Sequence, residues 1–416
     1  MSAAAPPPPP LAPHPAGGAA ARAVERLAEA AVSLLPVHEA LAPPVRVAHP
    51  GWDGATRGAP PPPAGWVGGD ELLRRAATRV GLPPVVVCPA AAAAELPLFQ
   101  RAVSAHLAGP ALGDPACAVP AASLAEADAV VRAACEEHRR RWPCAVVRSF
   151  DGTPLRAYTA GHRGRPVVVV AAVCGMPAAL CGEWLRALGR EYFVLTWETR
   201  GMFGAGAGEF DHAGWEVETQ ARDLFAVMDH FRVETAHLVG LCGGAALALA
   251  AAALRAPRVR SLSLWHGDYE LGPATPRTPH QRNLKALMSM AAEGRGHAAD
   301  VHRVLSRSRP PQVPPGVAHL VLYPYASAEL LYRYCTLNGR IMNTDLSPWL
   351  PRVRGPALVV TSHDDDTSHP EASRRVAAAV PGATLRVLPR GHHLAAFEAD
   401  AARVELAARF IAGEPP

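Results

Sequence analysis

The sequence predicts an α/β fold with a mostly parallel central sheet and helices on both faces. From residue 144 onward, short apolar segments alternate with helical patterns, and this alternation is typical of βαβ units. Residues 167–173 form an unbroken apolar run rich in valine, as expected for a strand buried on both faces. The chain has 416 residues and 49% hydrophobic content, which is enough for one large core or two smaller ones.

Eight strands are expected, and an Asp151-Gly152 turn joins the first two into an antiparallel hairpin. The strands are predicted at residues 146–150, 155–159, 167–173, 192–197, 236–240, 261–265, 357–361 and 384–388. Helices are predicted at 182–188, 216–231, 244–254, 371–380 and 399–411.

One connection is too long for a simple crossover. About 268–354 separates two strands that we expect to be neighbours, and a structureless loop of that length would be unusual. Helical patterns occur within it at 281–293 and 327–337. Because open α/β sheets bind ligands at the carboxyl ends of their strands, we predict a helical lid over that edge.

The N-terminal part of the chain has a different composition. Residues 1–66 are rich in proline and alanine, which predicts a largely disordered extension with one helical pattern at 19–35. Residues 67–143 are predicted to form a small, mainly helical segment, either a packing appendage or a cover for the site. Residues 144–416 would then form the catalytic domain.

Composition excludes several classes of function. The 41 Lys and Arg residues nearly balance the 37 Asp and Glu residues, and no basic block indicates a nucleic acid as partner. The eight cysteines show no CxxC pair and no metal-ligand spacing, so we expect no metal and a reducing, cytoplasmic environment. No segment predicts a signal peptide or a membrane span. No cofactor is implied, and the oligomeric state is left open.

The motif Gly240-Leu241-Cys242-Gly243-Gly244 lies between an expected strand and an Ala-rich helix. In a strand-turn-helix elbow the nucleophile has a strained backbone, so the residues two before and two after it must be small. Gly240 and Gly244 satisfy this requirement. The positive end of the helix would favour a thiolate at Cys242. The alternative is a buried structural cysteine at a tight packing turn.

Three further segments follow expected strands. Cys174-Gly175-Met176-Pro177 follows the strand at 167–173, and Ser362-His363-Asp364-Asp365-Asp366 follows the strand at 357–361. Pro389-Arg390-Gly391-His392-His393-Leu394 follows the last strand. Together with the elbow, these segments over about 145–412 resemble the α/β-hydrolase superfamily, whose nucleophile, acid and histidine occur in this order.

The resemblance implies a role for each matching residue. Cys242 would be the nucleophile, His393 the base and Asp365 the acid, with Asp268 as a second candidate for the acid. The backbone N–H groups of Met176 and Gly243 would form the oxyanion hole.

Two features of the chain depart from the superfamily pattern. Cys174 stands where members commonly have histidine, either as an apolar filler or as a second thiol near Cys242. Cysteine at the elbow resembles dienelactone hydrolases and a minority of polyketide or peptide thioesterases. We therefore expect a Cys-His-Asp enzyme that acts on a thioester, lactone or activated ester in secondary, polyketide-type metabolism, by hydrolysis or acyl transfer.

Two alternative functions stay open. One is a lyase of the same fold that eliminates acetate from an acetylated, tetronate-like intermediate, and the other is an inactive binding protein. The expected partner of the enzyme is a small-molecule or carrier-bound acyl substrate. The substrate-binding candidates are Trp265, Asp268, Tyr325 and Tyr332.

Overall fold

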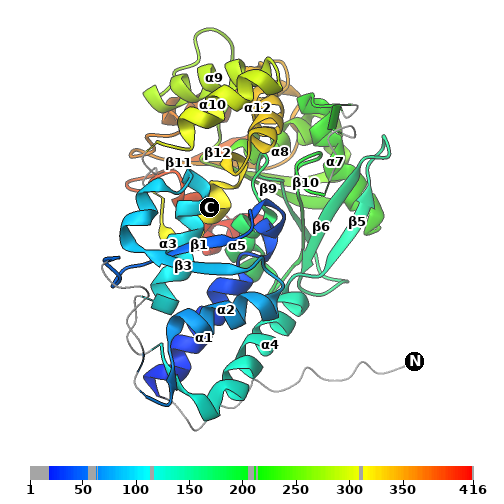
Figure 1. The fold of residues 1–416 in the computed structure, drawn as a ribbon. Helices are drawn as coiled ribbons and strands as arrows, with labels where there is room; N and C mark the ends of the chain where they lie inside the picture. Colours follow the sequence, from blue (N-terminus) through cyan, green and yellow to red (C-terminus); the bar gives the residue numbers. More distant parts are fainter. Residues whose placement is uncertain are drawn as a thin grey trace, which may run out of the picture. The chain divides into compact units, whose positions relative to one another are not determined.

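The computed structural model describes residues 18–54, 62, 64–112, 117–204, 210–211, 214–308 and 313–414. The chain divides into two compact units, both drawn in Figure 1. The first unit comprises residues 1–35, 42–95 and 103–137, and the second comprises 36–41, 96–102 and 138–416.

The first unit has regular structure within the segment predicted to be largely disordered. Apolar residues at helical spacing, including Val24, Leu27 and Ala31, are buried along one face of α1. Strand β1 pairs in parallel with β3, and β2 pairs antiparallel with β4. The elements are α1 (Ala19–Val32), β1 (Val45–His49), β2 (Trp66–Val67), α2 (Gly69–Val80), β3 (Val85–Pro89), η2 (Ala90–Glu95), β4 (Val119–Pro120) and η3 (Ala121–Ser123). Residues 1–17 of the predicted extension lie outside the described residues.

Three elements contain residues of both units: η1 (Leu35–Ala40), α3 (Leu98–Leu112) and α4 (Leu124–Arg141). Within the first unit, Asp128 of α4 is buried and forms ion pairs with Arg75 (2.6 Å) and Arg79 (2.8 Å) of α2. These two ion pairs compensate the buried charge and connect the two helices.

The second unit is built on one eight-stranded sheet with the strand order β12-β11-β10-β9-β7-β8-β6-β5. The β5–β6 and β6–β8 pairs are antiparallel, and the remaining neighbours are parallel. The strands are β5 (Cys144–Arg148), β6 (Pro154–Ala160), β7 (Val167–Val170), β8 (Phe193–Trp197), β9 (Ala236–Leu241), β10 (Val259–Trp265), β11 (Ala357–Ser362) and β12 (Ala383–Leu388). All eight expected strands are present, and the predicted α/β fold is confirmed.

Helices cover both faces of this sheet. Helix α8 can be buried because it consists of Ala, Gly and Leu, and residues 243–253 are all buried. It packs against β9, β10 and α7. The helices outside the long connection are η4 (Ala178–Cys181), α5 (Gly182–Leu188), α7 (Val217–His230), α8 (Gly243–Leu254), η5 (Ala256–Arg258), α13 (Pro370–Ala379), α14 (Ala395–Glu398) and α15 (Ala401–Ile411).

The long connection between β10 and β11, predicted as a lid, is mainly helical. Its elements are α9 (Pro279–Ala292), α10 (Arg295–Leu305), α11 (Pro315–Val321), η6 (Tyr323–Tyr325), α12 (Ala328–Asn343) and η7 (Leu350–Arg352). Helices α9, α10 and α12 pack together at the top of Figure 1, and α12 also packs against α8. This last contact brings the connection next to α8, the helix that begins directly after Cys242.

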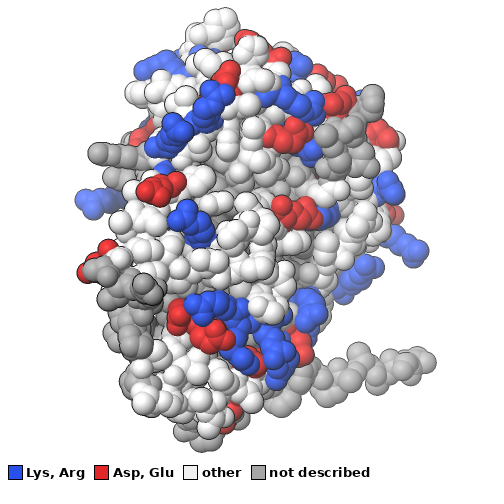
Figure 2. Space-filling model, in the orientation of Figure 1, with Lys and Arg blue, Asp and Glu red and all other residues white. Residues whose placement is uncertain are grey.

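Charge is mixed on the surface. Figure 2 shows Lys and Arg side chains among Asp and Glu on the face that it presents, in agreement with the small net charge of +4. No described helix combines the length and the apolar character needed to cross a membrane.

Glu198 follows β8 and is only 2% exposed. Burial raises the pKa of its carboxyl group to about 7, although Arg156 and a hydrogen bond with Tyr158 favour the charged form. An ordinary glutamate has a pKa of 4.5, so the folded protein keeps this proton at pH values where the unfolded chain releases it. The contribution of Glu198 to stability is therefore present below about pH 4.5 and is lost as the pH rises through 7.

We predict that Glu198→Gln reduces the loss of stability between about pH 5 and pH 8.5 by about 1–3 kcal/mol, because an amide has no charge to desolvate. Thermal unfolding of both proteins at the two pH values measures the effect. Glu183→Gln, at an exposed position, is the control and should leave the pH dependence unchanged. An identical pH dependence in wild type and Glu198→Gln would show that this carboxyl group ionises without cost.

Candidate active site

Cys242 occupies the sharp turn between β9 and α8. Its backbone has φ 54° and ψ −128°, a conformation rare for a residue with a side chain. A Cβ atom on Gly240 would lie 2.5 Å from Cα of Ala245, and one on Gly244 would lie 2.9 Å from the carbonyl oxygen of Ala172. Only glycine fits at these two positions, so the small residues required by the elbow are explained by backbone contacts. The Cys242 side chain is partly exposed.

His393 lies in the loop after β12. Its Nδ1–H donates to Oδ2 of Asp365 at 3.1 Å, since a carboxylate can only accept. Its Nε2 is buried and makes no hydrogen bond of normal geometry with any described residue. Burial lowers the pKa of His393, but the charge of the nearby Cys242 and the bond to Asp365 raise it well above its usual value. Nε2 is therefore the ring atom left to exchange a proton with the thiol.

Asp365 accepts four hydrogen bonds in the loop after β11. Oδ2 accepts from Nδ1 of His393 and from Nδ1 of His266 at 2.8 Å. Oδ1 accepts from the backbone N–H groups of Thr367 (3.0 Å) and Ser368 (2.8 Å). Burial raises the pKa of this carboxyl group, but the hydrogen bonds and the charge of His393 outweigh it and hold the pKa well below its usual range. Asp365 is therefore a carboxylate at neutral pH.

Sequence reasoning missed His266, which directly follows β10 just as Cys242 directly follows β9. The four side chains of the site thus come from the loops after four neighbouring strands, β9, β10, β11 and β12. The position of His266 directly after an expected strand was a sequence signal that could have identified it. One ring nitrogen each of His266 and His393 and one carboxylate oxygen of Asp365 lie within 4.8 Å of one another. Both imidazoles donate to one oxygen of Asp365, so hydrogen bonds account for this arrangement.

Asp268, the second candidate for the acid, lies near the elbow without bonding to the histidine. Its backbone N–H donates to the carbonyl oxygen of Cys242 at 3.4 Å, and its Oδ1 accepts from Nε2 of Gln281 at 2.6 Å. Burial raises the pKa of Asp268, although the Gln281 bond and the charge of His393 oppose this. Asp365, rather than Asp268, holds the imidazole in this structure.

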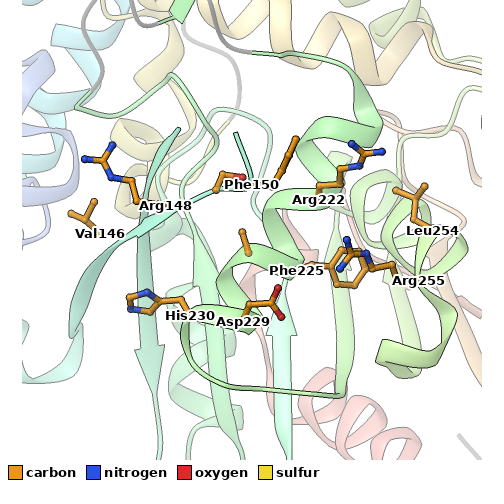
Figure 3. A pocket seen from close by; sticks show the side chains of 11 residues that line it. Val146, Arg148, Phe150, Arg222, Phe225, Asp229, His230, Leu254 and Arg255 are labelled. Carbon is orange, nitrogen blue, oxygen red and sulfur yellow. The ribbon is translucent and has the colours of Figure 1, made fainter. Parts of the chain in front are cut away.

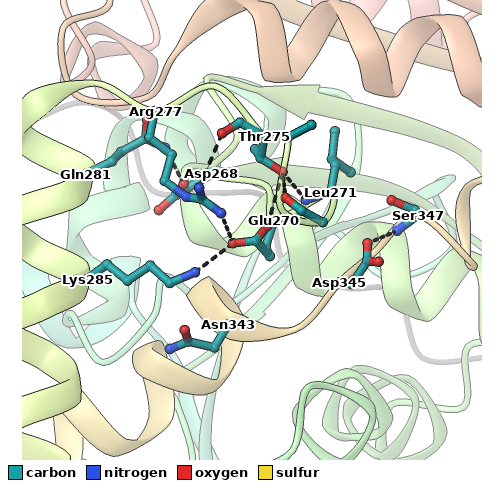
Figure 4. A network of polar contacts seen from close by, with 12 residues as sticks. Asp268, Glu270, Leu271, Thr275, Arg277, Gln281, Lys285, Asn343, Asp345 and Ser347 are labelled. Carbon is teal, nitrogen blue, oxygen red and sulfur yellow. Dashed lines mark hydrogen bonds and ion pairs between the residues drawn. The ribbon is translucent and has the colours of Figure 1, made fainter.

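Polar contacts anchor the start of the long connection, as Figure 4 shows around Glu270. The Glu270 carboxylate pairs with Lys285 at 2.7 Å and with Arg277, and it accepts from Oγ1 of Thr275 at 3.0 Å. These contacts hold α9 against the segment that follows β10. Asp268 and its partner Gln281 lie in the same region of Figure 4.

The predicted oxyanion role of Met176 is not met in this conformation. Residues 173–176 form a tight turn with positive φ at Cys174 (30°) and Gly175 (78°). This turn directs the N–H of Met176 to the carbonyl oxygen of Val173 at 2.7 Å. Gly243 differs, because it lies in the first turn of α8, where backbone N–H groups have no partner within the helix.

The structure places the aromatic substrate-binding candidates differently from one another. Trp265 ends the buried strand β10 and has no exposed surface, and its ring packs 5.1 Å from that of Trp184, so it belongs to the core. The Tyr332 ring lies 4.7 Å from the Arg295 guanidinium, a contact between α12 and α10. Tyr325 packs 6.0 Å from Tyr334 within the long connection.

Tyr334 approaches the site from α12. A Cβ atom on Gly175 would lie 2.9 Å from Cδ2 of this ring, which places Tyr334 against the turn after β7. Tyr334 is buried, and burial is the main cause that raises the pKa of its hydroxyl group. Among the aromatics of α12, Tyr334 is therefore better placed than Tyr332 to line the site.

A surface hollow of about 660 Å³ lies elsewhere on the second unit. Figure 3 shows its basic side chains Arg148, Arg222 and Arg255 around Phe150. It is lined by β5, α7 and the end of α8, and no residue of the Cys242 site contributes to it. The chemistry of the elbow is therefore independent of this hollow.

Comparisons with known proteins agree with this fold. Two curated relatives named "Putative carbamate hydrolase RutD" match the chain. The relative from Klebsiella pneumoniae is 28% identical over 236 residues (55% of this chain, 85% of the relative), and that from Caulobacter sp. is 26% identical over 273 residues (64% and 98%). No family model matches.

Solved structures match the same part of the chain. An enol-lactonase from Burkholderia xenovorans LB400 has a TM-score of 0.51 at 23% identity, covering 65% of this chain and 100% of its own. An esterase from Exiguobacterium antarcticum has a TM-score of 0.51 at 18% identity, covering 64% and 99%. The chain therefore has the α/β-hydrolase fold, and the curated relatives to which it is similar are named as hydrolases.

Cys174 is packed directly over the elbow. A Cβ atom on Gly243 would lie 2.2 Å from Sγ of Cys174. Cys174 is buried, and burial together with the charge of Cys242 raises the pKa of its thiol well above the usual value. Both observations favour an apolar filler.

We predict that Gly243→Ala destabilises the protein by about 2–4 kcal/mol, and that in a Cys174→Ala background the cost falls to about 1 kcal/mol or less because the clashing sulfur is gone. Denaturant unfolding of the four proteins of this cycle measures the coupling. Gly240→Ala is the matched control, because its clash is with backbone and Cys174→Ala should not relieve it. Additive effects of Gly243→Ala and Cys174→Ala would contradict the packing described above.

Replacing each of the two candidate acids by asparagine shows which of them acts with His393. We predict that Asp365→Asn lowers kcat/KM on an activated ester by about 10³-fold or more, because an amide no longer fixes the tautomer or balances the charge of His393. Asp268→Asn should cost about 10-fold or less, since Asp268 makes no bond to the imidazole. Steady-state kinetics on the two variants decide between them. A larger loss in Asp268→Asn would assign the acid role to Asp268.

Proposed function

We propose that the chain cleaves or transfers the acyl group of a thioester, lactone or activated ester through a triad of Cys242, His393 and Asp365. The observation that carries this proposal is the hydrogen bonding of the two ring nitrogens of His393. Its Nδ1 is bonded to a permanent carboxylate, and its buried Nε2 has no partner other than the nearby thiol. This arrangement matches the requirement for a base that activates a nucleophile.

The proposed reaction has two halves. Cys242 transfers its proton to Nε2 of His393, and its sulfur attacks the acyl carbon to form a tetrahedral oxyanion. The C–X bond to the leaving group then breaks, and the leaving group takes the proton from His393. The product is a thioester on Cys242. Water, or an acceptor hydroxyl, amine or thiol, then gives a proton to His393 and attacks the acyl carbon of this thioester. The C–S bond breaks, the acid or the transferred acyl product is released, and His393 returns the proton to the Cys242 sulfur.

The backbone N–H of Gly243 is the proposed donor to the oxyanion. The resemblance also assigns this role to Met176, whose N–H is bonded to Val173 here, so a second bond from it requires the turn at 173–176 to rearrange. Fixed donors of this kind lower the barrier because they need no reorganisation during the reaction.

A thiol nucleophile sets the proposed substrate class. Thiolates exchange well with good leaving groups and poorly with amides or simple alkyl esters, which favours thioesters, lactones and activated esters. The name of the solved enol-lactonase supports a lactone, and the curated name, putative carbamate hydrolase, supports a carbonyl compound with a heteroatom leaving group but not an activated one. We further propose a polyketide-type pathway and a small-molecule or carrier-bound acyl substrate, with Asp268 and the tyrosines of the long connection as binding candidates.

We predict that incubation with short-chain acyl thioesters of N-acetylcysteamine and with p-nitrophenyl esters adds one acyl mass to Cys242. The acyl group should persist longest in His393→Ala, because deacylation loses its base. Intact-mass and peptide mass spectrometry measure the adduct. Cys144 is an exposed thiol, so Cys144→Ala is the control and should label to the same extent as the wild type.

Cys242→Ala tests covalent catalysis itself, because it removes the sulfur and leaves His393 and Asp365 in place. Full turnover of this variant on the same substrates would refute a thioester intermediate. Retained turnover on a β-acetoxy carbonyl compound alone would favour the elimination of acetate, in which His393 abstracts a proton and Cys242 is never acylated.

A further inference from the structure

His266 has an unusual place in the second unit. It has no exposed surface, and its φ of 48° lies in the left-handed region that favours glycine or asparagine. Its backbone N–H donates to the carbonyl oxygen of Val360 at 2.8 Å, so β11 fixes this residue after β10. A bulky, buried side chain in this backbone conformation costs stability, and such strain is concentrated at functional sites.

The contacts of the His266 ring are limited to the triad acid. Nδ1 donates to Oδ2 of Asp365 at 2.8 Å, the oxygen that His393 also uses. Nε2 is buried without a hydrogen-bond partner among the described residues. The two imidazole rings lie 6.1 Å apart and nearly perpendicular at 87°. One polar atom of His266 is therefore used by Asp365, and the other is left unpaired at a cost.

Bonds other than that of His266 also hold Asp365. Backbone N–H groups of Thr367 and Ser368 hold its other oxygen, Oδ1. If His266 is removed, the carboxylate keeps these two bonds and its bond to His393. The bond from His266 therefore acts mainly on the negative charge at Oδ2, which it shares with His393.

We propose that His266 is a positioning residue that divides the Oδ2 charge of Asp365 between two imidazoles and thereby limits how tightly His393 holds its proton. The proposal rests on the proposed function, in which His393 must be neutral to activate the attacking water or acceptor. Four groups face His393: Cys242 after β9, His266 and Asp268 after β10, and Asp365 after β11. Once Cys242 is acylated, its charge is gone, and the two carboxylates and His266 determine the proton affinity of His393.

The test compares two variants of His266. His266→Phe keeps a ring of similar shape without a donor, and His266→Asn keeps an N–H donor and suits the left-handed backbone. The rate of deacylation of acyl-Cys242 is followed against pH in single turnovers. The rate falls at low pH as His393 gains a proton, and this fall is the acid limb of the profile. In His266→Phe the acid limb should move to higher pH by about half a unit or more, because Oδ2 then accepts a hydrogen bond from His393 alone. His266→Asn should restore the limb to within about 0.2 units of wild type.

Two results would overturn the proposal. A lower rate in His266→Phe with an unmoved acid limb would show a purely structural role. Equal shifts in His266→Phe and His266→Asn would show that the N–H donor is not the cause.

A second measurement does not need turnover or a folded His266→Phe variant. In ¹⁵N-histidine-labelled Cys242→Ala protein, proton NMR should show two strongly deshielded Nδ1–H signals, and His266→Asn should remove one of them. A single signal before substitution would overturn the shared carboxylate. If Cys242 is never acylated, the proposed function fails, and this spectrum still decides the role of His266.

Discussion

The candidate site depends on one interaction, the burial of the Asp365 carboxylate with four hydrogen-bond donors around it. An unpaired charge at this depth would be very unfavourable, and each of the four bonds reduces that cost. The donors come from the loops after β10, β11 and β12, so they meet only when these three strands pair in register. Folding of the sheet and assembly of the site are therefore the same event at this edge.

Backbone strain at the site shows the same dependence on packing. Three residues that follow strands of the sheet have positive φ: Cys174 after β7, Cys242 after β9 and His266 after β10. Their side chains are thereby directed to the carboxyl edge of the sheet. Backbone bonds hold two of the three positions, because the N–H of Met176 donates to Val173 across Cys174 and the N–H of His266 donates to Val360. The buried contacts of α8 with β9 and β10 support the conformation at Cys242. The fully apolar character of α8 is thus a requirement of the site as well as of the core.

Sequence patterns predicted the fold because they report burial, and they predicted Cys242, Asp365 and His393 because each belongs to a motif after a strand. His266 was missed because its neighbours form no such motif. The Met176 bond depends on the φ angles of a turn, which the letters Cys-Gly-Met-Pro do not fix. Trp265, a predicted substrate-binding residue, lies in the core in this structure, because its ring packs against that of Trp184. Side-chain pairs across loops are set by tertiary geometry, which the local patterns of a single sequence do not reveal.

The start of the long connection is part of the scaffold of the site. Gln281 of α9 donates to Asp268 and, through Oε1, accepts from the backbone N–H of Thr278 (3.0 Å) and of His369 (3.1 Å). Thr278, which caps α9, also donates through Oγ1 to the carbonyl oxygen of Thr367 at 2.9 Å. Thr367 belongs to the loop that holds Asp365. A displacement of α9 would therefore break the bond to Asp268 and the bond from Thr278 to the loop that holds Asp365. These bonds tie the first helix of the long connection to the loops after β10 and β11, so α9 is part of the scaffold on which Asp268 and Asp365 are held.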